Sequence, residues 1–160
     1  MTAPRIGFIG AGNMASSLIG GMLQQNFKPA QLLASDHNPE QCQRIARQFG
    51  ISSSTDNAVL AADCDVLLLA VKPQVLPSLL PSLVTPLCRR KPLVISVAAG
   101  KTLSWLEQSL SCELALVRVM PNIAARVGEG MSAFCANGQV NDSHKKTVMQ
   151  IFEAVGVIIE

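Results

Sequence analysis

The stretch Arg5-Ile6-Gly7-Phe8-Ile9-Gly10-Ala11-Gly12-Asn13-Met14-Ala15 decides the fold of this 160-residue chain. Its apolar first half predicts a short β-strand, the glycines predict a tight turn, and apolar residues with helical spacing predict a helix over 13–25. In such a unit Gly10 permits the turn, Gly12 lets the backbone approach a phosphate, and Ala15 keeps the helix close to the strand. The pattern favours a phosphate-binding turn of the kind that holds a dinucleotide over a purely structural turn.

The rest of the chain alternates predicted strands with predicted helices. Further strands are expected at 32–35, near Ile51, and at 65–71, 93–97, 114–119, 131–135 and 157–159, and further helices at 39–49, 56–62, 102–110 and 141–154. Prolines at 77, 81 and 86 predict broken helical turns over 74–87. The alternation predicts an α/β fold, a Rossmann-type doubly wound and mostly parallel sheet flanked by helices, in one domain over residues 1–160.

The composition argues against several classes of protein. Thirteen basic and eleven acidic residues give a net charge of +2 and are scattered along the chain, so we expect no nucleic-acid partner and no anionic membrane surface. The longest apolar run, residues 66–71, is far shorter than the ~20 residues of a membrane-spanning helix. The apolar run at the N-terminus is too short for a signal peptide, so the expected location is the cytoplasm.

The five cysteines form no recognisable framework. They are Cys42, Cys64, Cys88, Cys112 and Cys135. There is no Cys-x-x-Cys pair, the number is odd, and the flanking sequences are not alike, which predicts unrelated reduced thiols. His37 and His144 are isolated as well, so no metal site is expected.

The residue that ends the second predicted strand bears on the choice of cofactor. Asp36 stands where an acid could hold the adenosine ribose hydroxyls of NAD(H). With Asn38 and Pro39 beside it, Asp36 could instead belong to the start of the next helix, which is the less favoured reading. No arginine stands at this turn to bind the 2′-phosphate of NADP(H), although Ser35, His37 and Asn38 could hydrogen-bond it. The choice between NADP(H) and NAD(H) stays open at this point.

The residues that follow two later predicted strands can each be interpreted in two ways, as facing a cofactor or as purely structural. In Ala70-Val71-Lys72-Pro73 the proline fixes the backbone and Lys72 could face a cofactor, or the proline simply ends a strand beside an exposed lysine. In Ala98-Ala99-Gly100 the small residues allow a flat group to approach, although small residues are also common at strand ends. The residues alone leave both questions open.

Taken together, four motifs resemble the N-terminal domain of the pyrroline-5-carboxylate reductase family. They are Phe8-Ile9-Gly10-Ala11-Gly12-Asn13-Met14-Ala15, Ala70-Val71-Lys72-Pro73-Gln74, Ser96-Val97-Ala98-Ala99-Gly100 and Val117-Arg118-Val119-Met120-Pro121-Asn122. Their order and separations match, and the resemblance covers essentially the whole chain. It implies NAD(P)H-dependent hydride transfer to the small molecule 1-pyrroline-5-carboxylate, giving L-proline in the last step of proline biosynthesis.

The resemblance also implies which residues bind NADP(H) or NAD(H). The pyrophosphate would be held by Ile9, Gly10, Ala11, Gly12, Asn13 and Met14, the adenosine ribose by Ser35 and Asp36 with Asn57 nearby, and the nicotinamide half by Ala70, Val71, Lys72, Pro73, Val97, Ala98 and Ala99. No residue is assigned as a certain catalytic group, but Asn122 and Lys72 would lie near the reaction centre.

The chain departs from the family pattern in two respects. The usual Met-Pro-Asn-Thr-Pro-Ala motif is changed, because Ile123 and Ala124 replace the threonine and proline. Family members continue into a C-terminal helical domain that dimerises and supplies most of the substrate pocket, which is expected to lie beyond these 160 residues. The isolated chain would then be inactive, and the homo-oligomer would form through that domain. Two alternatives remain, namely a non-catalytic NAD(P)-binding sensor and the nucleotide domain of a β-hydroxyacid-type dehydrogenase.

Overall fold

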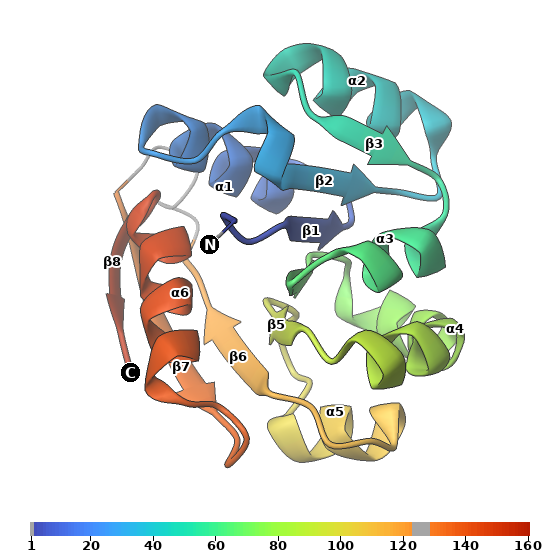
Figure 1. Ribbon diagram of the computed structural model, residues 1–160. Helices are drawn as coiled ribbons and strands as arrows, with labels where there is room; N and C mark the ends of the chain where they lie inside the picture. Colours follow the sequence, from blue (N-terminus) through green and yellow to red (C-terminus); the bar gives the residue numbers. More distant parts are fainter. Residues whose placement is uncertain (1, 123–128) are drawn as a thin grey trace.

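The computed structural model describes residues 2–122 and 129–160, and within them eight strands form one sheet with helices on both faces (Figure 1). The strands are β1 (Ile6–Ile9), β2 (Leu32–Ser35), β3 (Ser52–Ser54), β4 (Val66–Leu69), β5 (Leu93–Ser96), β6 (Leu116–Met120), β7 (Gly130–Ala136) and β8 (Gly156–Ile159). The helices are α1 (Asn13–Gln24), α2 (Pro39–Phe49), α3 (Asn57–Asp63), α4 (Leu76–Arg90), α5 (Leu103–Leu110) and α6 (Asp142–Glu153), with short 3₁₀ turns η1 (Pro29–Gln31) and η2 (Pro73–Val75). The predicted α/β fold is confirmed.

The strand order places the candidate site. It runs β3-β2-β1-β4-β5-β6-β7-β8, and neighbouring strands are parallel from β3 to β6. The chain moves outward in one direction from β1 to β3 and in the other from β4, so the order reverses between β1 and β4. Ligands of doubly wound sheets bind at such a reversal, beyond the carboxyl ends of the strands. β7 is antiparallel to β6, because the nine residues 121–129 between them are too few for a helical crossover.

Two apolar cores cover the two faces of the sheet. Phe8 and Leu68 point to the side packed by α1, α2 and α6, whereas Ile9 and Leu67 point to the side packed by α3, α4 and α5. β1 and β4 are buried along their whole length. Burial on both faces explains why these strands are continuously apolar.

Local capping chemistry fixes the helix starts as the sequence predicts. The Asn38 side chain accepts a hydrogen bond from the Glu40 N–H at the start of α2, and Gly50 ends that helix in the left-handed conformation. The Asn141 side chain caps α6 in the same way. These boundaries are confirmed because caps depend on residues within one turn.

The prediction of broken turns over 74–87 is wrong, because α4 is one continuous helix of 15 residues. Pro81 and Pro86 lie inside it and away from the buried side. The buried side carries Leu76, Leu79, Leu80, Leu83 and Leu87, spaced at helical intervals. Each buried leucine contributes roughly 2 kcal/mol, so their burial outweighs the roughly 3 kcal/mol that each interior proline costs.

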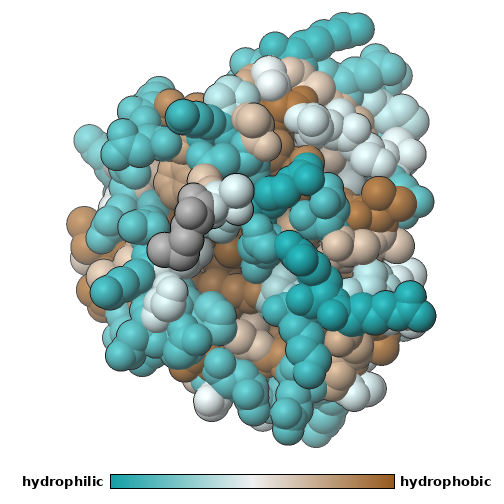
Figure 2. Space-filling model, viewed as in Figure 1, coloured by the Kyte–Doolittle hydropathy of each residue, from teal (hydrophilic) through white to brown (hydrophobic). Residues whose placement is uncertain are grey.

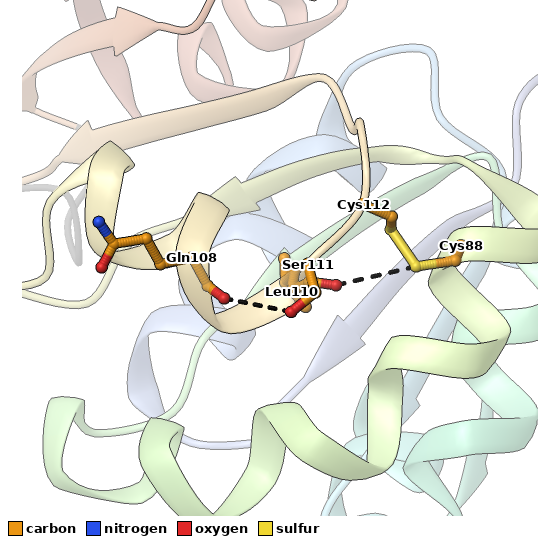
Figure 3. The surroundings of a disulfide bond; sticks show 5 residues. All are labelled: Cys88, Gln108, Leu110, Ser111 and Cys112. Carbon is orange, nitrogen blue, oxygen red and sulfur yellow. Dashed lines mark hydrogen bonds between the residues drawn. A yellow bond between two sulfur atoms is a disulfide. The ribbon is translucent and has the colours of Figure 1, made fainter.

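The prediction of five reduced thiols is also wrong, because Cys88 and Cys112 form a disulfide (Figure 3). Cys88 is in the last turns of α4, and Cys112 follows α5 after Ser111, with their Cα atoms 5.9 Å apart. α4 and α5 pack against each other, which brings together two residues 24 positions apart. No local pattern indicates this pairing, because it depends on how the two helices pack.

Thiol labelling at pH 8 without a reductant should separate the five cysteines. Cys135 is exposed and should react first, whereas Cys42 and Cys64 are buried. Burial, and then the charge of Asp65, raises the pKa of the Cys64 thiol to about 12, so its reactive thiolate is almost absent at this pH. Intact mass should show one fast adduct in the native protein and three after unfolding. Five adducts after unfolding would contradict the disulfide.

The surface is predominantly hydrophilic on the side shown in Figure 2, with apolar residues in separate patches. Four apolar side chains of the outer strands are more than half exposed, namely Met120, Met131, Val157 and Ile159. Met131 pairs with Val157 and Ala133 with Ile159, so the outer face of β7 and β8 is apolar. No helix among the described residues has the length and apolar character needed to cross a membrane.

Candidate functional site

The turn after β1 requires glycine at its first position. Gly10 has φ of 101°, and its N–H donates to the Ser35 carbonyl at 2.8 Å. A Cβ atom at this position would lie 2.4 Å from the carbonyl oxygen of Ala70, which follows β4. Only glycine therefore allows the loop to pass so close to the neighbouring strand end.

Gly12 has a different environment. A Cβ atom on Gly12 would meet nothing within 4 Å, so the space in front of this residue is open. Gly12 is the N-cap of α1, and no side chain caps the first turn, to which Asn13 and Met14 belong. Open space beside an uncapped helix start, with its backbone N–H groups and positive dipole end, fits a diphosphate group.

Ala11 lies between the two glycines, and its backbone N–H and carbonyl each form a hydrogen bond with a charged side chain. Its N–H donates to Asp36 Oδ2 at 2.9 Å, and its carbonyl accepts from Arg44 Nη2 at 2.6 Å. The other oxygen of Asp36, Oδ1, accepts the Asn38 N–H at 2.9 Å. Asp36 therefore ties the glycine loop to the start of α2, while Asn38 is the cap of that helix.

A hollow of about 380 Å³ lies beside the glycine loop, at the reversal of strand order. It is lined by Ile9, Gly10, Asp36, His37, Asn57, Val71, Val75, Ser78 and Leu79. Ser35 lies beneath it, fully buried, and its hydroxyl donates to Asn57 Oδ1 at 2.6 Å. Apolar walls with a few fixed polar groups suit an adenosine, and the Ser35 hydroxyl fixes the orientation of the Asn57 side chain.

The remaining predicted residues follow β4, β5 and β6, at the same edge of the sheet. Pro73 starts η2, and Lys72 before it is exposed. After β5, Ala98 is buried and its N–H donates to the Ser96 hydroxyl, while Ala99 is exposed. The structure therefore brings the predicted residues together at one edge of the sheet.

The last predicted residues lie at the end of β6. Asn122 follows this strand after Pro121 and is exposed. Ile123 and Ala124, which replace the family's threonine and proline, lie outside the described residues. The effect of these replacements stays a prediction.

Arg44 is the residue at this site that sequence reasoning missed. It lies in α2, eight positions after Asp36, so it is not part of the turn where an arginine was sought. The sequence holds no local signal for this contact, because the contact depends on how α2 packs beside the glycine loop. Among the described residues, no group of three or more histidine, cysteine, aspartate or glutamate side chains could hold a metal ion.

Comparison with known proteins places this geometry in a family. Residues 5–100 match the family model described as NADP oxidoreductase, coenzyme F420-dependent. The pyrroline-5-carboxylate reductase of Pseudomonas aeruginosa is 42% identical over 159 residues, which are 99% of this chain and 58% of that protein. The chain thus spans somewhat over half the length of the curated relatives it matches.

Solved structures of pyrroline-5-carboxylate reductases have the same fold as this chain. A pyrroline-5-carboxylate reductase from Coxiella burnetii superposes with a TM-score of 0.95 at 31% identity, covering 99% of this chain and 58% of that one. The Plasmodium falciparum pyrroline carboxylate reductase, solved with NADP bound, gives 0.86 at 32% identity over 100% of this chain and 58% of that one. This chain therefore belongs to the family described by that model, NADP oxidoreductase, coenzyme F420-dependent, and over nearly its whole length it is similar to pyrroline-5-carboxylate reductases.

Proposed function

We propose that the chain is the cofactor-binding part of a pyrroline-5-carboxylate reductase. The reaction is transfer of a hydride from NADP(H), or NAD(H), to the carbon of the C=N bond of 1-pyrroline-5-carboxylate, and the product is L-proline. The observation that carries the proposal is the open space at Gly12 beside the uncapped start of α1. Similarity to the reductases over the whole chain supports this function over a β-hydroxyacid dehydrogenase.

The residues of this chain would bind and orient the cofactor. The N–H groups at the start of α1 would hold the pyrophosphate, and the hollow that Asn57 lines would bind the adenosine. The bound cofactor supplies the hydride. The small side chains of Ala98 and Ala99 would allow the nicotinamide to lie flat against the end of β5, with Lys72 and Asn122 near the reacting atoms.

The substrate pocket and the oligomer belong to the part of the proposal that concerns the whole protein. The relatives are longer than this chain. We propose that a helical C-terminal part of the whole protein binds the substrate and forms a homo-oligomer. The proposed location is the cytoplasm.

Two measurements test the function. The 160-residue chain should bind NADPH or NADH in a calorimetric titration, and the complete gene product should consume reduced cofactor when pyrroline-5-carboxylate is added, with proline formed in equal amount. Binding without proline formation would support a cofactor-binding sensor instead. Absence of both binding and turnover would reject the proposal.

A further inference from the structure

Arg44 places an unneutralised positive charge against the glycine loop. Its Nη2 donates to the Ala11 carbonyl at 2.6 Å and to Ser16 Oγ at 3.2 Å. Its Nε donates to Gln41 Oε1 at 2.8 Å, and its Nη1 to Gln48 Oε1 at 3.1 Å. All four acceptors are neutral, and Arg44 forms no ion pair within the part of the chain that the structure describes. The guanidinium is fixed in place without a counter-charge.

The position of this charge relates it to one part of a dinucleotide. Asp36 binds the N–H of Ala11 and Arg44 binds its carbonyl and Ser16, so the guanidinium lies between α1 and α2, next to the corner that the glycine loop forms with the end of β2. In a Rossmann-type sheet the adenosine ribose lies at this corner, and the residues there distinguish a 2′-hydroxyl from a 2′-phosphate.

We propose that Arg44 is the specificity-determining residue that binds the 2′-phosphate of NADP(H); this rests on the proposed function, since it requires a dinucleotide at the glycine loop. A planar guanidinium matches a phosphate with two parallel hydrogen bonds. The amides of Gln41 and Gln48 are neutral acceptors on the same helix, and a phosphate can replace them at Nε and Nη1 while Nη2 stays on Ala11.

Asp36 then has a positioning role. Its two oxygens accept the N–H groups of Ala11 and Asn38, and its side chain is only 14% exposed. These donors offset the charge of the Asp36 carboxylate, which lines the hollow, and Arg44 supplies a positive charge at the other polar group of Ala11. The chain should therefore prefer NADPH to NADH by at least tenfold, even though an acid ends β2.

The test is a comparison of affinities in matched variants. The 160-residue chain is titrated separately with NADPH and NADH. Arg44→Gln should raise the Kd for NADPH about 10- to 100-fold, as expected for a charged hydrogen-bonded contact, and change the Kd for NADH less than about twofold. Arg44→Lys should recover part of the loss. Arg47→Gln removes the same charge from an exposed position on the same helix and should leave both constants unchanged.

The outcomes separate this proposal from the function on which it rests. Equal weakening of NADPH and NADH by Arg44→Gln would mean that Arg44 only supports the loop, and would overturn the proposal while leaving cofactor binding intact. An equal effect of Arg47→Gln would overturn it too, because the charge would then act from a distance. If the unaltered chain binds neither cofactor, the proposed function fails and this assignment fails with it. The ratio of the two affinities is insensitive to partial unfolding of a variant.

Discussion

Replacing Gly12 with alanine should weaken binding of the reduced cofactor about a hundredfold while lowering the free energy of unfolding by no more than about 1 kcal/mol. A Cβ atom at Gly12 touches no protein atom within 4 Å, so the folded chain accommodates it. The same atom fills the space through which a diphosphate would approach the start of α1. Loss of about two charge-assisted hydrogen bonds, each worth about 1.5 kcal/mol, accounts for the hundredfold change.

Gly10 provides the matched control, since replacing it with alanine should act mainly by lowering the stability of the fold. A Cβ atom would lie 2.4 Å from the Ala70 carbonyl oxygen, and φ of 101° is unfavourable for alanine. Gly10→Ala should cost about 3 kcal/mol of stability in urea unfolding. Calorimetric titration and urea unfolding of both variants check the pair. Unchanged cofactor affinity in Gly12→Ala would show that the loop does not hold the phosphates.

The sequence predicts those parts of the fold that depend on neighbouring residues. The boundaries of α2 follow from Asn38 and Gly50, which act within one turn. The glycine loop is predictable for the same reason, because strand, turn and helix are contiguous. The helix α4 is different, because Pro81 and Pro86 argue against it locally and the buried leucines that stabilise it gain their energy from the sheet and α5. In α4 the local cost of the prolines opposes the free energy of burying the leucines, and the burial contributes more.

The residues of the candidate site also differ in whether neighbouring residues or tertiary packing determine their positions. Residues that directly follow strands, such as Gly10, Asp36 and Ala98, could be predicted because parallel strands end at one edge. Arg44 could not, since its role depends on a side chain that crosses from α2 to another loop. Asp36 belongs to the start of α2, as its Oδ1 accepts the Asn38 N–H, whereas its contact with the adenosine ribose stays a prediction.

Removal of the Cys88–Cys112 disulfide should lower the free energy of unfolding by about 3 kcal/mol. The bond joins residues 24 positions apart, and closing a loop of that length restricts the unfolded chain by about this amount of free energy. Cys88→Ala, Cys112→Ala and the double variant should each lose the same 3 kcal/mol, because each breaks one and the same bond. The melting temperature should fall by roughly 8 °C.

Urea unfolding with and without a reductant checks this expectation. The reductant should bring the unaltered protein close to the level of the variants and leave the variants unchanged. Cys135→Ala, at an exposed thiol, is the control and should change the stability by less than about 0.5 kcal/mol. Additive losses in the double variant, or no effect of the reductant, would show that the two sulfurs contribute separately through packing.

The disulfide also has a defined relation to the candidate site. The chain between Cys88 and Cys112 contains β5, the Ala98-Ala99-Gly100 turn and α5, so the bond closes a loop around the segment proposed to face the nicotinamide. β5 is held between β4 and β6 by its backbone hydrogen bonds, whereas α5 is attached by side-chain packing. Reduction should therefore increase amide hydrogen exchange in α5 before it does so in β5. Equal increases in both elements would mean that the segment opens as one unit.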